Sequence, residues 1–302
     1  MLLSNPLAYP LLPSLGLTLV GLFASSLLAL VISARGHWHV LVASVLFARW
    51  RAWLVIAPVF VAVVLSGVVP LAAFAAVLAV QGSREYARLT DLPSIDRQLL
   101  LGISACVPLL AIVAPTSLLG PALLAVPLLL SLPVILGQDV ERGVPRLTRL
   151  VFGVWYLPVA LSTLVLLERD ARGGPGLLLA LGLAVALSDV GAFTTGRIFG
   201  RRPLAPRLSP AKTWAGVVGN VLGAALGVGL VARAAPDAPL VLLVPVVAIG
   251  AVWGDLLESA LKRAAQTKDS GACLPGFGGL LDRIDSLLVV LPFSYVLLTV
   301  TR

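Results

Sequence analysis

Charged residues are scarce in this sequence. They make up 12% of its 302 residues, while hydrophobic residues make up 59%. Soluble domains carry about 25% charged residues, so this chain has too little polar surface to face water on every side. Long apolar stretches of this kind require lipid as their solvent. The composition therefore excludes a soluble globular domain and indicates an integral membrane protein.

Residues that bind metals or act as nucleophiles are also few. The chain has two cysteines and two histidines, and none of them has the spacing of a zinc site. Cys106 falls in an apolar stretch and Cys273 in a polar loop, so we expect no disulfide between them. The sequence has no GxxxxGK[ST] loop, no kinase signature and no nucleophile elbow. The common soluble nucleotide-binding folds are therefore excluded.

What the sequence has instead is a series of apolar segments with lengths suited to crossing a bilayer. No Lys or Arg precedes the first one, so we expect a true span there and not a cleavable signal peptide. The fold class that we predict is an all-α, polytopic integral membrane protein with about 9–10 transmembrane helices. The candidate spans are residues 11–33, 52–66, 69–83, 98–114, 118–137, 150–167, 176–195, 213–232, 239–257 and 285–300.

The basic residues orient these spans. With the N-terminus outside, all but four of the 22 Lys and Arg residues fall in inside loops. Cytoplasmic loops carry such an excess. Because the loops are compact and no organellar targeting feature is present, we expect a bacterial inner (cytoplasmic) membrane, with the active site on the cytoplasmic side. The four exceptions are Arg169, Arg172, Arg233 and Arg302.

The net charge of +8 arises largely in these inside loops. Such loops suit anionic headgroups and phosphates, so we expect membrane lipids and no nucleic acid as partners. We expect residues 1–170 to form a lipid-facing scaffold of helices and residues 171–302 to carry the chemistry, within one integrated membrane domain. Gly219, Gly223 and Gly227 recur every four residues, which is typical of close helix packing and compatible with a homodimer without requiring one.

Two polar clusters mark inside ends of the later spans. Asp189 lies near the end of an apolar span, where a carboxylate has a partner or a function by default, although an Asp that reaches the interface is the alternative. Further on, Ser209 is placed to N-cap the next helix, with Pro210 at its first position. A helix N-terminus beside Lys212 and Thr213 suits a phosphate, but a capped, positively flanked span end explains the same residues.

A third cluster is the densest. Asp255, Glu258 and Lys262 share one helical face, and Asp282 and Asp285 share another. A Pro/Gly-rich turn between the two helices brings these faces together. Carboxylates beside Lys and Arg at a membrane boundary suit a divalent cation together with phosphates. The alternative is an inside loop whose opposite charges only pair with one another.

The third cluster closely resembles the signature of the CDP-diglyceride synthases, also called phosphatidate cytidylyltransferases. That signature reads S-x-x-K-R, then K-D, then a Pro-Gly-His-Gly-Gly turn, then D-R-x-D. The first two clusters are similar to the family segments D-x-x-A-Y-x-x-G-R and S-P-x-K-T-x-x-G. Glu85-Tyr86 is a weaker match to the same family. The strong match covers residues 188–290. The matching signature residues are Ser259, Lys262, Arg263, Lys268, Asp269, Pro275, Gly276, Gly278, Gly279, Asp282, Arg283 and Asp285.

Two residues depart from the family pattern. Phe277 stands where the family has the turn histidine, and Phe193 stands in place of the usual tyrosine. Neither position carries a carboxylate or a lysine, so we expect the metal and phosphate machinery to be retained. The lost histidine leaves open an altered activity or an altered lipid substrate, such as an ether-linked acceptor.

The resemblance implies a nucleotidyltransferase of phospholipid biosynthesis. CTP and phosphatidic acid would give CDP-diacylglycerol and pyrophosphate, with Mg²⁺ as cofactor and a second cation left open. This reaction needs charge neutralisation and alignment more than a general base. We expect catalytic roles for Asp255, Asp282, Asp285, Lys262 and Arg263. The expected metal ligands are Asp255, Asp282, Asp285, Asp189 and Glu258. The expected substrate-binding residues are Ser209, Lys212, Thr213, Lys268, Asp269, Arg283, Gly278 and Gly279.

Three other functions stay open on the sequence. A CTP-dependent kinase acting on a polyprenol- or phytol-like alcohol would release CDP instead of pyrophosphate. An ion-coupled transporter would need charges at mid-membrane depth, and the first half of the chain has almost none. An inactive homologue with a scaffolding role is favoured only by Phe277.

Overall fold

The computed structural model describes residues 12–33, 37, 44–114, 116–170, 174–230, 239–267, 269–271 and 278–300. Its first half contains α1 (Leu12–Ser33), α3 (Val45–Leu65), α4 (Val68–Leu89), α5 (Ser94–Leu110), α6 (Thr116–Leu136), α7 (Gly143–Val154), a π-helical turn η2 (Trp155–Val159) and α8 (Ala160–Asp170). Its second half contains α9 (Gly174–Phe199), β1 (Pro203–Ala205), β2 (Ser209–Thr213), α10 (Trp214–Leu230), α11 (Leu240–Ala264) and α12 (Leu281–Val300).

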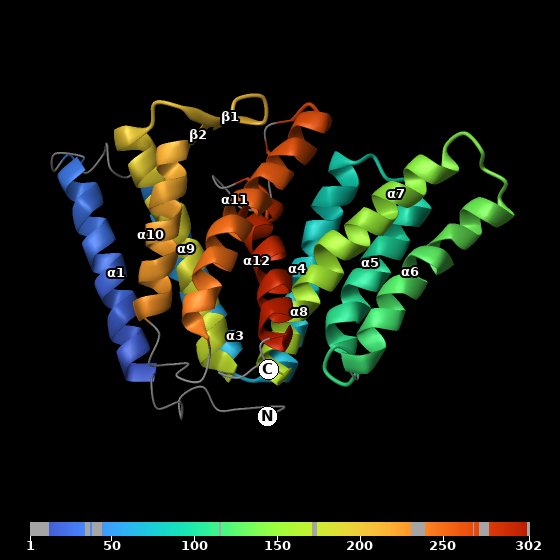
Figure 1. Cartoon of the computed structure of the whole chain (residues 1–302), viewed down its shortest axis with the longest axis horizontal. Coiled ribbons are helices and arrows are strands. Elements are labelled where there is room, and N and C mark those ends of the chain that lie inside the picture. Colours follow the sequence, from blue (N-terminus) through green and yellow to red (C-terminus); the bar gives the residue numbers. More distant parts are fainter. Residues whose placement is uncertain are drawn as a thin grey trace.

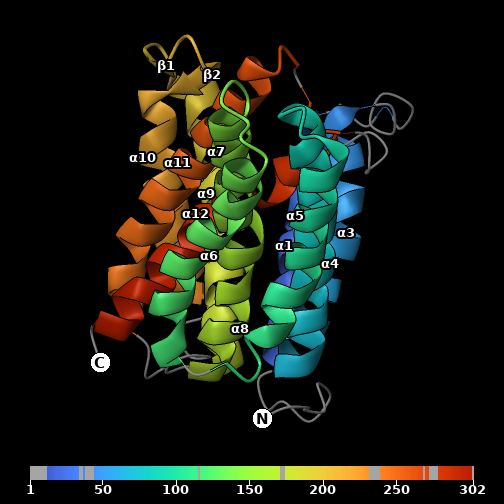
Figure 2. The ribbon, with the colours of Figure 1, turned by 90° about the vertical axis from the view of Figure 1, so that its right-hand side faces the viewer.

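The helices form one bundle in which the chain runs alternately up and down (Figure 1 and Figure 2). Among the described residues, five helices are long and apolar enough, by length and composition, to cross a membrane. Shorter apolar helical stretches occur in α1, α3, α6 and α10. Each predicted span coincides with one helical segment, with α7, η2 and α8 joined as one. The predicted fold class, an all-α polytopic membrane protein, is confirmed.

Several helices extend beyond their predicted spans, and α3 and α4 show what this adds. Helix α3 begins at Val45, where the Ser44 hydroxyl accepts a hydrogen bond from the backbone N–H of Phe47 at 3.1 Å. Helix α4 continues to Leu89. Its last two turns therefore include Glu85 and Tyr86, and both side chains are buried. A charged side chain reaches the interior at the end of a membrane helix, which a hydropathy pattern alone does not reveal.

The core of the bundle is centred on α8. Residues 160–167 of this helix are all buried, and α8 packs against α4, α9 and α12. Because lipid is as apolar as Leu, helices in a bilayer associate mainly through close packing and polar contacts. A helix that is apolar and buried on all sides therefore belongs in the middle of such a bundle, and α8 lies there.

The predicted small-residue stripe packs within the chain. Gly219, Gly223 and Gly227 of α10 lie directly against the backbone of α9, so an added Cβ at any of them would collide with that helix. Gly191 of α9 lies equally close to the carbonyl of Gly219. The prediction of close helix packing is confirmed. Because α9 already covers the stripe, it does not support a dimer.

The segment before α10 differs from the prediction. Residues 203–205 and 209–213 pair as a short antiparallel hairpin, in which Ala205 faces Ser209 and Pro203 faces Thr213. The helix begins only at Trp214, and the Thr213 hydroxyl accepts from the N–H of Gly216 at 3.1 Å. The predicted N-cap at Ser209 is therefore wrong, because strand pairing takes up the backbone there and Thr213 caps the helix instead.

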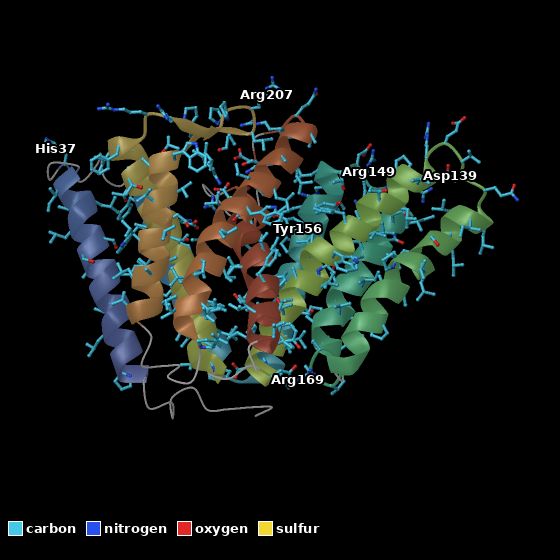
Figure 3. The ribbon with its side chains drawn as sticks, in the orientation of Figure 1. His37, Asp139, Arg149, Tyr156, Arg169 and Arg207 are labelled. Carbon is cyan, nitrogen blue, oxygen red and sulfur yellow. The ribbon has the colours of Figure 1, made fainter. Side chains whose placement is uncertain are left out.

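The end of the bundle that carries this hairpin is called the hairpin face below. Most of the described basic residues lie at helix ends or loops on this face, and Figure 3 labels Arg149 and Arg207 there. Figure 3 places Arg169 at the opposite end. Its guanidinium donates to the carbonyls of Ala111 and Ala114, both at 2.7 Å, and pairs with Asp170 at 2.7 Å. Arg169 thus caps the end of α5, which gives this exception to the charge bias a structural role.

Candidate active site

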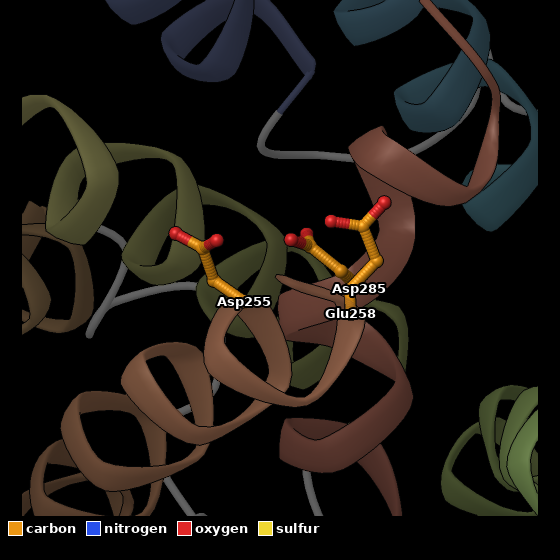
Figure 4. Close-up of side chains that lie close together, drawn as sticks. All are labelled: Asp255, Glu258 and Asp285. Carbon is orange, nitrogen blue, oxygen red and sulfur yellow. The ribbon is translucent and has the colours of Figure 1, made fainter. Parts of the chain in front are cut away.

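Three carboxylates meet near the hairpin face, where α11 and α12 pack together. Asp255 and Glu258 stand one turn apart on α11, and Asp285 faces them from α12 (Figure 4). One oxygen from each side chain lies within 4.8 Å of one from each of the others. Gly254 makes this approach possible, because a Cβ there would collide with the backbone of Asp285 and Ser286. These residues are named the carboxylate cluster.

The carboxylate cluster is only partly accessible. Glu258 is 1% exposed and Asp285 is 9% exposed, whereas the Asp255 side chain is 42% exposed. Solvent can therefore reach the cluster at Asp255 but not at Glu258. The buried Glu258 Oε1 has no hydrogen-bond partner among the described residues. A buried polar atom normally has a partner, and an unpartnered carboxylate oxygen beside two other carboxylates fits the oxygen ligands that a hard divalent cation prefers.

Two lysines flank the carboxylate cluster. Lys212 of β2 forms an ion pair with Asp255. Lys262 Nζ lies 2.5 Å from Glu258 Oε2 and 2.6 Å from Asp282 Oδ1. If all these groups are ionised, the four carboxylates outnumber the two ammonium groups by two charges. That excess matches the charge of a divalent cation, while the lysines supply donors for anionic ligands.

Asp282 lies in the same network, where it shares Lys262 with Glu258. Its Oδ2 accepts hydrogen bonds from the Ser270 hydroxyl at 2.7 Å, the Gly279 N–H at 2.9 Å and the Ser270 N–H at 3.2 Å. Lys262 binds its other oxygen. Asp282 thus holds the loop before α12 and orients Lys262, whereas Glu258 joins Asp255 and Asp285. Asp282 and Glu258 were both predicted as metal ligands, and of the two only Glu258 belongs to the group of three carboxylates.

Glu85 of α4 supports this loop from the first half of the chain. It is 1% exposed and accepts hydrogen bonds from the N–H groups of Leu280, at 3.0 Å, and Leu281, at 2.8 Å. The Ser270 hydroxyl also lies 3.4 Å from it. A carboxylate at a helix N-terminus satisfies otherwise unpaired backbone donors and complements the helix dipole. Glu85 therefore fixes the start of α12. The sequence indicated only a weak similarity to the family at this residue and did not predict this role.

Two glycines of the signature turn are required by this packing. Gly278 has a φ of +82°, a backbone conformation that favours glycine. A Cβ on Gly279 would collide with the Ser270 hydroxyl and with Glu85 Oε2. These contacts explain why the turn has glycine at both positions. Their predicted part in substrate binding stays a prediction.

The remaining predicted residues lie around this centre. Asp189 of α9 is exposed, and its electrostatic neighbours are Asp255, Lys212 and Arg283. Arg263 donates to the carbonyl of Leu208 at 3.4 Å and so links α11 to the hairpin. Thr213 caps α10, while Ser209 is half-buried in β2 and Asp269 is exposed. Lys268 and Phe277 lie outside the described residues.

Comparisons with known proteins agree on one family. The profile of the cytidylyltransferase family matches residues 47–301. A phosphatidate cytidylyltransferase of Mycobacterium leprae is 39% identical over 152 residues, which are 49% of this chain and 48% of that protein. One from Haemophilus influenzae is 42% identical over 134 residues, covering 41% of this chain and 46% of that protein. One from Pseudomonas aeruginosa is 38% identical over 158 residues, covering 51% and 58%.

The matched regions of these relatives are partial. The chain spans about half the length of the curated relatives that it matches. The family profile, in contrast, covers most of the chain and therefore includes α4, with Glu85, as well as α11 and α12, with the carboxylate cluster.

Proposed function

The chain belongs to the cytidylyltransferase family, and from that premise we propose that it is a phosphatidate cytidylyltransferase. It transfers CMP from CTP to phosphatidic acid and releases pyrophosphate. The observation that carries this proposal is the carboxylate cluster flanked by Lys212 and Lys262 at the polar end of a membrane bundle. This arrangement can hold a cation and phosphates together at the depth where a lipid headgroup lies.

The carboxylates would hold the cofactor. Asp255, Glu258 and Asp285 would bind a divalent cation, Mg²⁺ in our proposal, whose chemistry is to neutralise phosphate charge and align the two polyanions. The unpartnered Glu258 Oε1 supports this ligand set. Asp282 would support these three ligands by holding Lys262 in position.

The proposed reaction does not need a general base. The attacking oxygen belongs to the phosphate monoester of phosphatidic acid, whose second pKa is about 6. It is already an anion near neutral pH, so no side chain has to remove a proton from it. What the protein supplies is positioning and charge. Lys212 and Lys262 would exchange their carboxylate partners for phosphate oxygens when the substrates bind.

We place the hairpin face in the cytoplasm and the bundle in a bacterial inner membrane. The concentration of basic residues at this face supports that orientation, and CTP would reach the site from the same side. Residues 171–302 would supply the reacting groups. Residues 1–170 would hold them in place, as Glu85 does for α12. The lipid tails would remain among the helices with the phosphate at Asp255, the accessible end of the cluster.

A product assay tests the proposal. Protein purified in detergent is incubated with phosphatidic acid, labelled CTP and Mg²⁺, and the lipid and nucleotide products are separated. We expect a CMP-bearing lipid and pyrophosphate, both lost when EDTA removes the metal. Release of CDP together with a phosphorylated lipid alcohol would identify a kinase instead. Folded protein that forms neither product under these conditions would contradict the proposal.

A further inference from the structure

A tyrosine hydroxyl outside the signature motifs lies near the carboxylate cluster. Helices α7 and α8 are joined by the π-helical turn η2, residues 155–159, inside one 28-residue span. Pro158 lies in this turn. Proline has no N–H and its ring clashes with the carbonyl four residues earlier, so the wider π turn accommodates it. Such turns occur frequently at functional sites.

Tyr156, in this turn, is buried with an unsatisfied hydroxyl. The residue is 6% exposed, and its ring stacks on Phe152 with a centroid distance of 5.3 Å. Its Oη has no hydrogen-bond partner among the described residues. Buried tyrosine hydroxyls usually find a partner. The ring is therefore held by packing, while the hydroxyl remains available to a group that binds later.

The surroundings of this hydroxyl identify the kind of group. The carboxylates that act on it electrostatically are Asp285, Glu258 and Asp255, which are all the members of the carboxylate cluster. Figure 3 marks Tyr156 at mid-height in the bundle. Its π-helical turn leads directly into α8, the helix that packs against α12. Near the cluster, Glu258 Oε1 is an acceptor without a partner and Tyr156 Oη is a donor without a partner. The same charged region therefore contains an unpartnered acceptor and an unpartnered donor, which a cation and its anionic ligand could satisfy together.

We propose that Tyr156 is a substrate-binding residue whose hydroxyl donates a hydrogen bond to a phosphate oxygen held at the carboxylate cluster. A neutral phenol is a donor that needs no deprotonation near neutral pH, and a phosphate oxygen is a strong anionic acceptor. The oxygen belongs either to the nucleotide or to the lipid phosphate. This proposal rests on the proposed function, since that function is what brings phosphates to the cluster.

The test compares two substitutions that each remove one hydroxyl. Tyr156→Phe removes the proposed donor. Tyr295→Phe is the matched control, because its hydroxyl lies 3.5 Å from Asp170, at the end of the bundle opposite the hairpin face. Labelled CTP binding is measured with Mg²⁺ and without lipid, and kcat and KM are measured for both substrates. Thermal unfolding is recorded for each variant.

We expect Tyr156→Phe to lower kcat/KM about 10- to 100-fold, the loss typical of one hydrogen bond to a charged group. Tyr295→Phe should stay within about twofold of the parent protein. Weaker CTP binding would assign the contact to a nucleotide phosphate. Unchanged CTP binding with a higher KM for phosphatidic acid would assign it to the lipid phosphate. The unfolding temperature of Tyr156→Phe should not fall, because the hydroxyl has no partner in the protein to lose.

The contrary result is equally clear. If CTP binding, kcat and both KM values of Tyr156→Phe stay within about twofold of the parent, the inference fails. An unfolding temperature well below the parent's would likewise reveal a structural hydroxyl. Failure of the proposed function is separate, because it appears as absence of the lipid product in the parent protein. CTP binding by the parent and by Tyr156→Phe can then still be compared.

Discussion

At the scale of single residues, Asp285 joins the two helices of the site. It is 9% exposed and faces Asp255 and Glu258 across the contact between α11 and α12. Its proposed role as a metal ligand depends on its negative charge, whereas its packing depends on its shape. Asparagine keeps the shape and removes the charge, so the two contributions can be separated by a single substitution.

We predict that Asp285→Asn lowers turnover by about 10²- to 10³-fold, the range seen when a charge-stabilising group is removed from an active site. Mn²⁺ binding, followed by electron paramagnetic resonance without substrate, should weaken as well. The matched control is Asp91→Asn, at an exposed turn residue with a φ of +50° that Asn also tolerates. A folded Asp285→Asn protein with parental turnover would refute the assignment.

The two lysines offer a contrast in burial. Lys262 bridges Glu258 and Asp282, which are almost fully buried, whereas Asp255, the partner of Lys212, is 42% exposed. Removing one partner of a buried ion pair leaves uncompensated charge and costs about 3–5 kcal/mol. An exposed pair contributes about 0–1 kcal/mol. The two sites should therefore differ in stability even if both bind phosphates.

We predict that Lys262→Met lowers the free energy of unfolding by about 3 kcal/mol, while Lys212→Met lowers it by less than about 1 kcal/mol. Both substitutions should weaken CTP binding, because both remove a phosphate donor. Thermal or denaturant unfolding in detergent gives the first quantity, and equilibrium CTP binding gives the second. Equal stability losses for the two variants would show that burial does not separate them.

At the scale of elements, the start of α12 depends on α4. Glu85 accepts the N–H groups of Leu280 and Leu281, while Asp282 binds Ser270 and Gly279 in the adjoining loop. The position of Asp285 follows from the helix that Glu85 anchors. We therefore propose Glu85 as a positioning residue, which would act on the proposed chemistry through α12.

We predict that Glu85→Gln destabilises the protein by about 1–3 kcal/mol, since its amide places donors against backbone donors at a buried helix end. Hydrogen exchange should accelerate at the first turn of α12, and kcat should fall more than the KM for CTP changes. Gln81→Ala is a suitable control, because Gln81 donates to Glu85 at 3.1 Å from one turn earlier in α4 and leaves the Glu85 carboxylate in place. Unchanged exchange at α12 in Glu85→Gln would show that the helix start does not need this carboxylate.

At the scale of the whole molecule, orientation decides which compartment supplies CTP. The hairpin face carries most of the described basic residues and the carboxylate cluster, and the opposite end carries Arg169 (Figure 3). With both native cysteines replaced, we predict that Arg207→Cys reacts with a membrane-impermeant maleimide only in inverted membrane vesicles. Val113→Cys, which is 76% exposed at the end of α5, should react only in intact spheroplasts. The reverse labelling pattern would show that the hairpin face lies outside the cytoplasm. Cytoplasmic CTP could then not reach the site, and the proposed orientation would be refuted.

The sequence by itself determined the membrane class, the helical segments and the residues that gather at one end. Apolar runs set the spans because an unpaired backbone cannot face lipid, and the basic loops predict their sidedness. The signature residues around Asp255 and Asp285 were identified because local spacing places them on shared helical faces. All of these are properties of neighbouring residues along the chain.

Only the tertiary structure decided which carboxylates lie together and which groups each of them binds. Glu258 joins Asp255 and Asp285 because α11 presents it to α12, while Asp282 turns toward Ser270 and Lys262. Glu85 binds the start of α12 and Tyr156 interacts electrostatically with the carboxylate cluster, although both belong to segments about a hundred residues or more away in the chain. Hydropathy and helical periodicity describe one segment at a time. The partner of a side chain on another segment is fixed only when the helices pack.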